Sequence, residues 1–546
     1  MTEHPAQDTL ARMLWRRVDL SGDRPAQMVK QGDRWETLTW SQVGTQVREL
    51  ALGLLALGLR AGEAVAILSR SRAEWVQADF AIFSVGGITV PIYPSYTAEQ
   101  IAYIINDSAA RLLVVEDASQ LANVLEVRGR MAGLGRIVVI AGYEGQDPTR
   151  LSWEALRQLG RDHATTFGAA LAARVADADP KQVATIVYTS GTTGPPKGVV
   201  QTHENHLAML ASVTQVAPAR PGDVHVLFLP LAHSFGRLEA FMGVYLGLTT
   251  AFAESPDKLG DDIREVRPHF LVAVPRVFEK VHAKILADVQ AGPRLKRGVF
   301  AWAMRVGRQL SDRRMAGRPV STLLALRHRL AHRLVFARLQ AALGGRLRFA
   351  VSGGAALSPE TAAFFHAAGI LILEGYGLTE SCPVLTFNRL DRFRFGSVGQ
   401  PVPGVEIRLA PDGEILARGP NIADPFISQA LVYGDGRPYP VALVTVNPEA
   451  AAGLARSRGI PWTDHARLSQ LPEVTARVER IIAEKNAHLQ SYARIKRFAV
   501  LPTELTEEAG EVTPTQKLKR KRVAEKYANV LESLYDSKPG RRRVTT

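Results

Sequence analysis

The chain has 546 residues, a formal net charge of +14 and one cysteine, Cys382. This length indicates more than one domain, and a single cysteine excludes an intramolecular disulfide and fits a reducing compartment. No uncharged apolar run is long enough to cross a bilayer, and the first residues lack a secretory pattern, so we expect a cytoplasmic protein. We expect Cys382 to pack in the core rather than to act as a reactive thiol.

Short apolar strands alternate with helices through the first half of the sequence. Thr39 is the predicted N-cap of a helix that runs to Gly58, and a strand at 64–68 follows. Further helices are expected at 75–83 and 98–105, and further strands at 88–94, 112–115 and 137–140. This alternation predicts an α/β fold in which parallel sheets are covered by helices on both faces.

The segment from Tyr188 to Val200, YTSGTTGPPKGVV, follows a buried-strand pattern and contains only Ser, Thr, Gly and Pro between Tyr188 and Lys197. Its glycines permit close backbone approach, and successive amides in such turns form an anion-binding nest. A flexible linker has no reason to follow a buried strand or to carry its only charge at its end. The spacing differs from that of a Walker loop. We therefore predict a phosphate site made by Thr189, Ser190, Gly191, Thr192, Thr193, Gly194 and Lys197.

This segment resembles the phosphate loop of the adenylate-forming superfamily, which includes acyl-CoA synthetases, luciferases and peptide-synthetase adenylation domains. Further segments resemble that family in the order it requires: LPLAHSFGR (229–237), VPRVFEK (274–280), SGGAAL (352–357), EGYGLTE (374–380), GSVGQPVPG (396–404), GEILARGPN (413–421) and TPTQKLKRK (513–521). The first two most resemble long-chain fatty acyl-CoA synthetases.

The resemblance implies a large N-terminal domain of parallel sheets flanked by helices and a small C-terminal α/β domain that closes over it. In this sequence we expect the AMP-binding domain at 1–421, a shortened lid domain at 422–537 and a basic disordered tail at 538–546.

The implied reaction activates a fatty acid with ATP and transfers the acyl group to CoA. The carboxylate displaces pyrophosphate from the α-phosphorus, and the CoA thiol then expels AMP, so the site requires fixed donors, a metal and a cation. By the resemblance, Glu380 and a hydroxyl of Thr192 help to hold Mg²⁺, and Thr379 binds the α-phosphate. His233 lies by the carboxylate, and Lys517 contacts that carboxylate and the α-phosphate in the transition state. Taken alone, His233 also fits a structural histidine, and Lys517 fits a solvated lysine.

Tyr376 offers a ring on which adenine can stack, because its neighbours on both sides are glycines. The implied adenine pocket consists of Gly353, Gly354, Ala355, Glu374, Gly375, Tyr376 and Gly377. The apolar segment 241–247 fits an acyl tunnel and core packing equally well. Acyl chain length and oligomeric state stay open at this point.

Much of the positive charge lies between Arg294 and Arg348, where Asp312 is the only acidic residue. Within this segment, 321–343 has the pattern of an amphipathic helix with an N-cap at Ser321 and Leu323, Leu326, Leu330 and Leu334 on one face. The pattern favours an ordinary surface helix packed on the core over peripheral contact with anionic lipid. No nucleic-acid partner is expected, because no aromatic residues interleave the basic C-terminal runs.

One part of the family pattern is missing after Asn421. The pattern there contains a Thr-Gly-Asp whose aspartate binds ribose, an Asp-Arg hinge and a Gly-Gly-Lys loop, but here the chain runs directly into ADPFISQALVYGDGRPYP. About sixty to seventy residues are absent, which exceeds ordinary loop variation. Loss of the ribose contact is expected to weaken ATP binding about ten- to a hundredfold. Loss of the hinge is expected to harm thioester formation more than adenylation.

Three interpretations stay open. The chain is a working long-chain fatty acid-CoA ligase (AMP-forming) with a shortened junction, a degenerate homologue that binds nucleotide or acyl-adenylate without full turnover, or the product of an altered reading frame. The first interpretation is an enzyme and the second a binding protein. Retention of Lys197, Glu380 and Lys517 favours the enzyme, and the missing segment favours the binding protein.

Overall fold

The computed structural model describes residues 8–145, 147–189, 196–409, 413–423, 427–434, 437–447, 451, 454–455, 460–487, 494–506, 508–512 and 518–535. The chain divides into two compact units. The large unit comprises residues 1–188 and 200–423, and the small unit comprises residues 189–199 and 424–546.

A seven-stranded sheet in the first half has the strand order β7-β6-β5-β3-β4-β8-β9. Its strands are β3 (Ala64–Leu68), β4 (Ile88–Ile92), β5 (Leu112–Val115), β6 (Arg136–Val139), β7 (Arg150–Ser152), β8 (Val183–Thr189) and β9 (Lys197–Thr202). The pairings from β7 through β3 and β4 to β8 are parallel. The helices that alternate with these strands are α2 (Trp40–Ala56), α3 (Ala73–Ser84), α4 (Ala98–Asp107), α5 (Ala118–Glu126), α6 (Trp153–Asp162) and α7 (Ala164–Ala176).

Local sequence explains these elements, and the predicted alternation is confirmed. Thr39 caps α2 with a complete capping box, in which its hydroxyl accepts a hydrogen bond from the Gln42 amide and the Gln42 side chain accepts one from the Thr39 amide. Every residue of β3 is buried, as expected of a parallel strand covered on both faces.

A nine-stranded sheet has the order β16-β15-β14-β13-β12-β10-β11-β1-β2. Its strands are β1 (Pro25–Gln31), β2 (Arg34–Thr39), β10 (Val224–Leu227), β11 (Thr249–Phe252), β12 (Phe270–Ala273), β13 (Phe349–Ser352), β14 (Ile372–Tyr376), β15 (Thr386–Phe387) and β16 (Gln400–Pro401). The central pairs are parallel, and antiparallel strands close both edges. Further helices of this unit are α1 (Leu10–Ser21), α8 (His203–Val216), α9 (Ser234–Leu246), α10 (Leu259–Val266), α11 (Pro275–Gln290) and α15 (Pro359–Ala367), of which α9, α10 and α15 contact strands of this sheet. The hairpin β17 (Glu406–Leu409) and β18 (Ile415–Arg418) follows.

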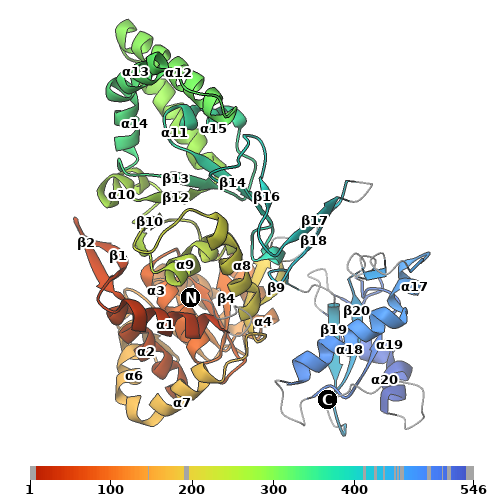
Figure 1. Cartoon of the computed structure of the whole chain (residues 1–546). Coiled ribbons are helices and arrows are strands. Elements are labelled where there is room, and N and C mark those ends of the chain that lie inside the picture. The colour runs from red at the N-terminus through yellow and green to blue at the C-terminus, as the bar shows by residue number, and fades with distance from the viewer. Residues whose placement is uncertain are drawn as a thin grey trace. The chain divides into compact units, whose positions relative to one another are not determined.

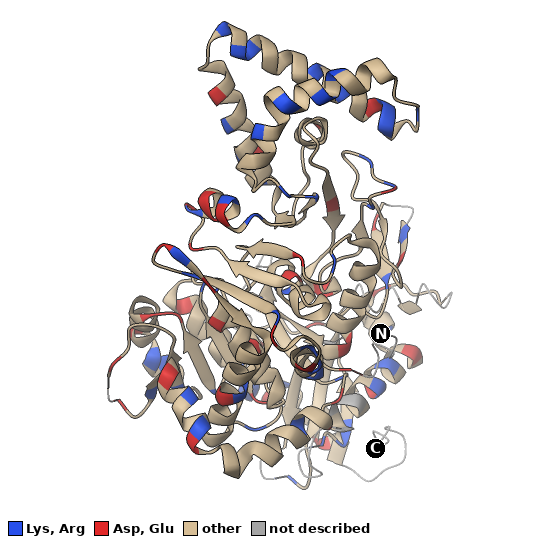
Figure 2. Ribbon diagram, turned by 60° about the vertical axis from the view of Figure 1, so that its left-hand side comes forward, with Lys and Arg blue, Asp and Glu red and all other residues tan. Residues whose placement is uncertain are grey.

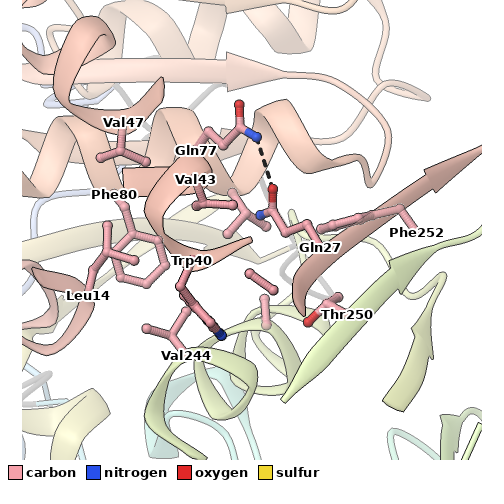
Figure 3. A pocket seen from close by; sticks show the side chains of 13 residues that line it. Leu14, Gln27, Trp40, Val43, Val47, Gln77, Phe80, Val244, Thr250 and Phe252 are labelled. Atoms are coloured by element: carbon pink, nitrogen blue, oxygen red, sulfur yellow. Dashed lines mark hydrogen bonds between the residues drawn. The ribbon is translucent and has the colours of Figure 1, made fainter. Parts of the chain in front are cut away.

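The core of the large unit is close-packed around α2, α3 and α9. A small cavity remains among these helices and β1, with a volume of about 20 Å³, room for a single water molecule (Figure 3). Across this cavity the side-chain amide of Gln77 donates a hydrogen bond to the side-chain oxygen of Gln27 at 2.9 Å. Cys382 is 1% exposed, and burial raises the pKa of its thiol well above the usual value, which confirms that it packs in the core.

Helices α11, α12 (Arg294–Met315), α13 (Thr322–Ala331), α14 (Ala337–Ala342) and α15 gather at one end of the large unit (Figure 1). A single π-helical turn, η3 (His332–Phe336), joins α13 to α14, and the predicted cap at Ser321 accepts a hydrogen bond from the Leu324 amide. The predicted packing of this helix is wrong in one respect. Leu324, Ala331 and Phe336 face the core, while the leucine row singled out by the sequence is exposed.

The small unit contains a three-stranded sheet of β19 (Ile427–Tyr433), β20 (Val441–Val446) and β21 (Arg497–Val500). β19 and β20 are antiparallel, and β20 and β21 are parallel. All six residues of β20 are buried. The helices of this unit are α17 (His465–Ser469), α18 (Pro472–Ala487), α19 (Arg520–Lys526) and α20 (Ala528–Tyr535). Within the described part of the chain, no helix combines the length and apolarity needed to cross a membrane.

Candidate active site

Two loops that the sequence assigned to adenine lie side by side at the carboxyl ends of β13 and β14. These strands are parallel neighbours, with Ser352 paired to Glu374, so the chain leaves both of them at the same edge of the sheet. A Cβ added to Gly353 would lie 3.1 Å from the Phe235 ring, and one added to Gly377 would lie 1.7 Å from the Pro383 carbonyl oxygen. Packing therefore requires glycine at 377, and any larger side chain must displace backbone.

Glu374 and Tyr376 occupy this edge in different ways. The Glu374 carboxylate is buried and accepts a hydrogen bond from the Leu357 amide at 3.3 Å, which holds the loop that begins at Gly353. Burial raises the pKa of Glu374, while the amides of Leu357 and Gly396 counteract that rise. Tyr376 is half-buried between Gly375 and Gly377. Glu374 thus orders the loop, and the stacking role of Tyr376 stays a prediction.

A short 3₁₀ turn, η4 (Thr379–Ser381), carries the two residues predicted to contact the α-phosphate and the metal. The Gln201 side chain, at the end of β9, donates to the Thr379 carbonyl at 2.5 Å. From the other side, the Ala423 amide donates to the Glu380 carbonyl at 2.7 Å. The Asn421 side chain donates to the Ser381 carbonyl at 2.7 Å. The turn is thus held by β9 and by the last residues before the shortened junction.

The Glu380 carboxylate fits a magnesium site of the kind found with nucleotides. Glu380 is half-buried, and among the described residues no three His, Cys, Asp or Glu side chains cluster as a metal site. Mg²⁺ at such sites takes one or two protein carboxylates and otherwise substrate phosphates and water. A single carboxylate such as that of Glu380 meets this requirement.

The predicted phosphate loop is described only at its two ends. Thr189 ends β8, and its hydroxyl donates to the Lys197 carbonyl at 3.5 Å; Lys197 begins β9 and is exposed. The remaining predicted contacts, Ser190, Gly191, Thr192, Thr193, Gly194 and Lys517, lie outside the described residues.

His233 is the N-cap of α9, and its Nδ1 accepts a hydrogen bond from the Phe235 amide at 3.1 Å. With Nδ1 as acceptor, the neutral ring carries its proton on Nε2. Partial burial lowers the pKa of His233, so the ring is neutral at pH 7. A neutral, partly exposed imidazole can donate from Nε2 to a substrate carboxylate.

Four residues after His233, Arg237 makes a buried polar contact that sequence reasoning missed. Its guanidinium donates to both oxygens of Asp79 at 2.7 Å and to the Thr185 hydroxyl in β8. Arg237 and Asp79 are each 1% exposed, and the guanidinium also lies over the Phe241 ring. The pair joins α3, α9 and the strand that leads to the phosphate loop. An arginine one turn after His233, on a helix whose only other charged residue is Glu239, was the available signal.

The segment 241–247 packs in the core rather than opening a channel. The Phe241 ring contacts the rings of Phe80 and Phe83 at centroid distances of 5.7 and 6.1 Å. Val244 lines the small cavity of Figure 3, whose volume of about 20 Å³ is far below the several hundred Å³ of a ligand pocket. Of the two interpretations of this segment, the structure favours packing.

In the small unit, Glu511 organises the base of the loop that carries Lys517. Val512 and Leu518 form an antiparallel bridge, and the Lys519 amide donates to the Glu511 carbonyl at 2.8 Å. The Glu511 side chain is 2% exposed and accepts hydrogen bonds from Lys526 at 2.6 Å and from the Tyr527 hydroxyl at 2.8 Å. The Glu511 main-chain carbonyl therefore holds Lys519, while its carboxylate holds Lys526 and Tyr527.

The Glu511→Gln variant is expected to lower the free energy of unfolding of the small unit by about 1.5–3 kcal/mol at pH 7, the size of a hydrogen bond to a charged group. Burial alone would raise the pKa of Glu511, but hydrogen bonds from Lys526, Thr506 and Tyr527 outweigh it and hold the pKa below its usual value. A lowered carboxyl pKa stabilises the fold above the unfolded pKa of about 4.3, and that contribution is lost as pH falls further. Urea unfolding at pH 7 and near pH 4 measures both effects.

The exposed Glu525 on α19 provides the control, since Glu525→Gln removes the same charge without a buried partner. If the stability of wild type and of Glu511→Gln depends on pH in the same way, the Glu511 carboxylate does not stabilise the fold as assigned.

With this geometry in place, comparison with known proteins defines the class of the chain. The family model described as "AMP-binding enzyme" matches residues 14–425, and the "AMP-binding enzyme C-terminal domain" matches residues 420–539. The chain belongs to the AMP-binding enzyme family, and the resemblance to adenylate-forming enzymes is confirmed.

The chain is similar to the long-chain-fatty-acid–CoA ligase FadD15 of Mycobacterium bovis, with 34% identity over 92% of this chain and 93% of the relative. It is also similar to the peroxisomal long chain acyl-CoA synthetase 6 of Arabidopsis thaliana, with 28% identity over 92% of this chain and 82% of the relative. Among solved structures, the anthranilate CoA ligase AuaEII in complex with anthranoyl-AMP has a TM-score of 0.57 at 20% identity, over 97% of this chain and 99% of that one. FadD1 from Archaeoglobus fulgidus has a TM-score of 0.56 at 18% identity, over 91% and 97%. These likenesses confirm the α/β fold with a large parallel-sheet domain and a smaller C-terminal one.

The comparison with FadD15 also bears on the missing segment. The alignment extends over 567 positions, whereas 92% of 546 residues is about 502, so about 65 positions of the relative have no counterpart here. This number agrees with the gap expected after Asn421. The two family models meet at residues 420–425, where the sequence places that gap.

Proposed function

We propose that this chain activates a long-chain fatty acid with ATP through an acyl-adenylate and transfers the acyl group to CoA, releasing AMP and pyrophosphate. The observation that carries the proposal is the meeting of residues 353–355, after β13, with residues 375–377, at the end of β14, followed by a turn bearing Thr379 and Glu380. That turn is hydrogen-bonded to β9, the strand that Lys197 begins. The similarity to FadD15 supports the acid and the thiol as substrates.

In this proposal each group has one task. Residues 189–194 and Lys197 bind the β and γ phosphates, and Tyr376 stacks on adenine. The neutral His233 donates from Nε2 to the acid, orienting its carboxylate toward the α-phosphorus. Lys517 stabilises the charge that develops there. Mg²⁺, held by Glu380, Thr192 and phosphate oxygens, would neutralise phosphate charge when bound. The AMP-binding domain spans 1–421, the lid 422–537 and the basic tail 538–546.

A second candidate, adenylation or nucleotide binding without thioester formation, is favoured by the missing segment. Asn421 and Ala423 keep their hydrogen bonds to the Thr379–Ser381 turn, so the adenylation turn is intact up to the junction. The absent positions are those that the resemblance assigns to ribose binding, the hinge and placement of the thiol. The first half-reaction therefore keeps more of its residues than the second.

Exchange of labelled pyrophosphate into ATP, dependent on palmitate or another fatty acid, tests the first half-reaction, and a thioester assay with CoA tests the second. Exchange together with acyl-CoA establishes the full ligase. Exchange without acyl-CoA establishes the second candidate, and absence of exchange at every acyl chain length contradicts adenylation altogether.

The Glu380→Gln variant is expected to lower pyrophosphate exchange about a hundredfold and to raise the Mg²⁺ concentration needed for half-maximal exchange, because one anionic ligand is lost. A Mg²⁺ titration of the exchange rate measures both. Glu36→Gln, at an exposed carboxylate on β2, is the matched control. An unchanged Mg²⁺ requirement in Glu380→Gln would remove Glu380 from the metal site.

A further inference from the structure

Nearly all the excess positive charge of this chain lies in one group of helices. Residues 294–348 contain 14 Lys and Arg and a single acidic residue, Asp312, so they carry +13 of the net +14. These residues form α12, α13, η3 and α14, and Figure 2 shows Lys and Arg far outnumbering Asp and Glu on the helices at the top of the view. The rest of the chain is almost neutral. The basic balance is therefore a property of this surface, not of the overall composition.

The same helices expose a continuous apolar face. Leu323, Leu326, Leu330 and Leu334 are 56%, 64%, 51% and 46% exposed, and their spacing of three and four residues places them on one side of the helix. We call this set the leucine face. The helix already packs on the core through Leu324, Ala331 and Phe336, which are at most 7% exposed. The leucine face is thus a second apolar surface that the large unit does not cover.

Arginines border the leucine face on both sides. At 3.6 residues per turn, Arg327 lies along one edge of the face and Arg329 and Arg333 along the other. All three side chains are exposed, and no ion pair involves them within the described parts of the chain. Unpaired guanidinium groups beside exposed leucines are the pattern of a helix that lies in a membrane interface.

We propose that the leucine face and its bordering arginines dock this protein on an anionic lipid surface. The leucines enter the boundary between headgroups and acyl chains, and the arginines contact lipid phosphates. The helix packs on the core through Leu324, Ala331 and Phe336 and carries charged arginines, so it lies along the lipid surface without crossing the bilayer. This inference stands independently of the proposed function.

Charge and polarity favour lipid over other occupants. A nucleic acid would satisfy the arginines but leave four leucines in water, and no aromatic side chain accompanies the leucine face to stack on bases. A second copy of this chain docked face to face would bring two strongly basic surfaces together. An anionic bilayer satisfies both the apolar and the basic groups.

Sedimentation with vesicles tests the proposal on the full chain. Wild type is expected to bind mixed phosphatidylcholine and phosphatidylglycerol vesicles more tightly than phosphatidylcholine alone. Leu326→Gln with Leu330→Gln is expected to lower the partition coefficient at least about tenfold on mixed vesicles. Arg327→Gln with Arg333→Gln is expected to lower it about tenfold to thirtyfold, and only where anionic lipid is present.

Matched controls distinguish the effect of the leucine face from the effect of exposed leucines elsewhere on the protein. Leu20 and Leu409 are 57% and 68% exposed on other elements, so Leu20→Gln with Leu409→Gln is expected to bind like wild type. Thermal unfolding of each variant checks that exposed substitutions leave the fold intact. Vesicle binding unaffected by the Leu326 and Leu330 changes overturns the proposal. The proposal is also overturned if the wild-type protein does not bind vesicles. It is overturned as well if the protein binds duplex DNA through these arginines but does not bind lipid.

Discussion

Replacement of Lys517 by alanine is expected to lower the rate of fatty-acid-dependent pyrophosphate exchange by about two to three orders of magnitude. A preorganised cation that meets developing charge only in the transition state typically contributes this much. Lys517 itself lies outside the described residues, but both ends of its loop are described, and the Glu511 side chain and the bridge between Val512 and Leu518 hold them.

The neighbouring Lys521 offers a strict control for that experiment. It belongs to the same basic run, and it is exposed on α19. Lys521→Ala removes the same charge from the same segment, so it is expected to leave the exchange rate within about twofold of wild type. If Lys517→Ala and Lys521→Ala behave alike, Lys517 is a solvated member of the run and the assigned role is wrong.

Replacement of Arg237 by methionine is expected to lower the free energy of unfolding by about 3–5 kcal/mol, because it leaves Asp79 buried without its partner. Urea unfolding at pH 7 measures the loss. Substitution of both residues, Asp79→Leu with Arg237→Met, is expected to recover most of it, since a buried ion pair exchanged for packed apolar groups is often neutral. The double-mutant cycle gives the coupling energy directly. A double variant no more stable than Arg237→Met would show that Arg237 stabilises the fold through its contacts with aromatic rings instead.

The pH dependence of Arg237→Met has a defined sign. Burial raises the pKa of the Asp79 carboxyl, and Arg237 opposes that rise, so its removal leaves burial as the main influence. A carboxyl with a raised folded-state pKa keeps its proton in the fold while the unfolded chain loses it above a pH of about 3.9. The destabilisation is therefore expected to grow as pH rises through this range. It is expected to be smallest in acid.

These buried contacts bear on how the reaction is organised. Arg237 lies one turn from His233 and is hydrogen-bonded to Thr185, four residues before Thr189. Gln201 connects the end of β9 with the turn that holds Glu380. Under the proposed function, Arg237 therefore lies on the same helix as the residue assigned to the acid, and Gln201 holds the turn assigned to the metal. Under the proposed function, the shortened junction is the reason that the two half-reactions are expected to respond differently.

Sequence reasoning succeeded wherever a signal is local. A capping box at Thr39 and apolar runs such as 64–68 each reflect interactions between residues close in the chain, and these elements form as predicted. The family motifs are also short stretches, each built around a turn and its ligand groups. Their order along the chain was enough to identify the superfamily.

Interactions between distant segments could not be predicted in this way. Arg237 pairs with Asp79, which lies 158 positions away in the sequence. The residues next to either one do not indicate its partner. The leucine row at 323–334 has the same periodicity whether it meets the core or solvent, and the structure shows that its neighbour set at 324, 331 and 336 is buried instead.

The sequence by itself determined the α/β class, the family and the chemical types gathered at the site, because helix caps, strand periodicity and phosphate-binding turns arise from neighbouring residues. Only the tertiary structure decided which apolar face is covered, which buried charge is paired and which side chains hold the Thr379–Ser381 turn. Those outcomes depend on burial, and burial is set by how surfaces far apart in the chain fit together.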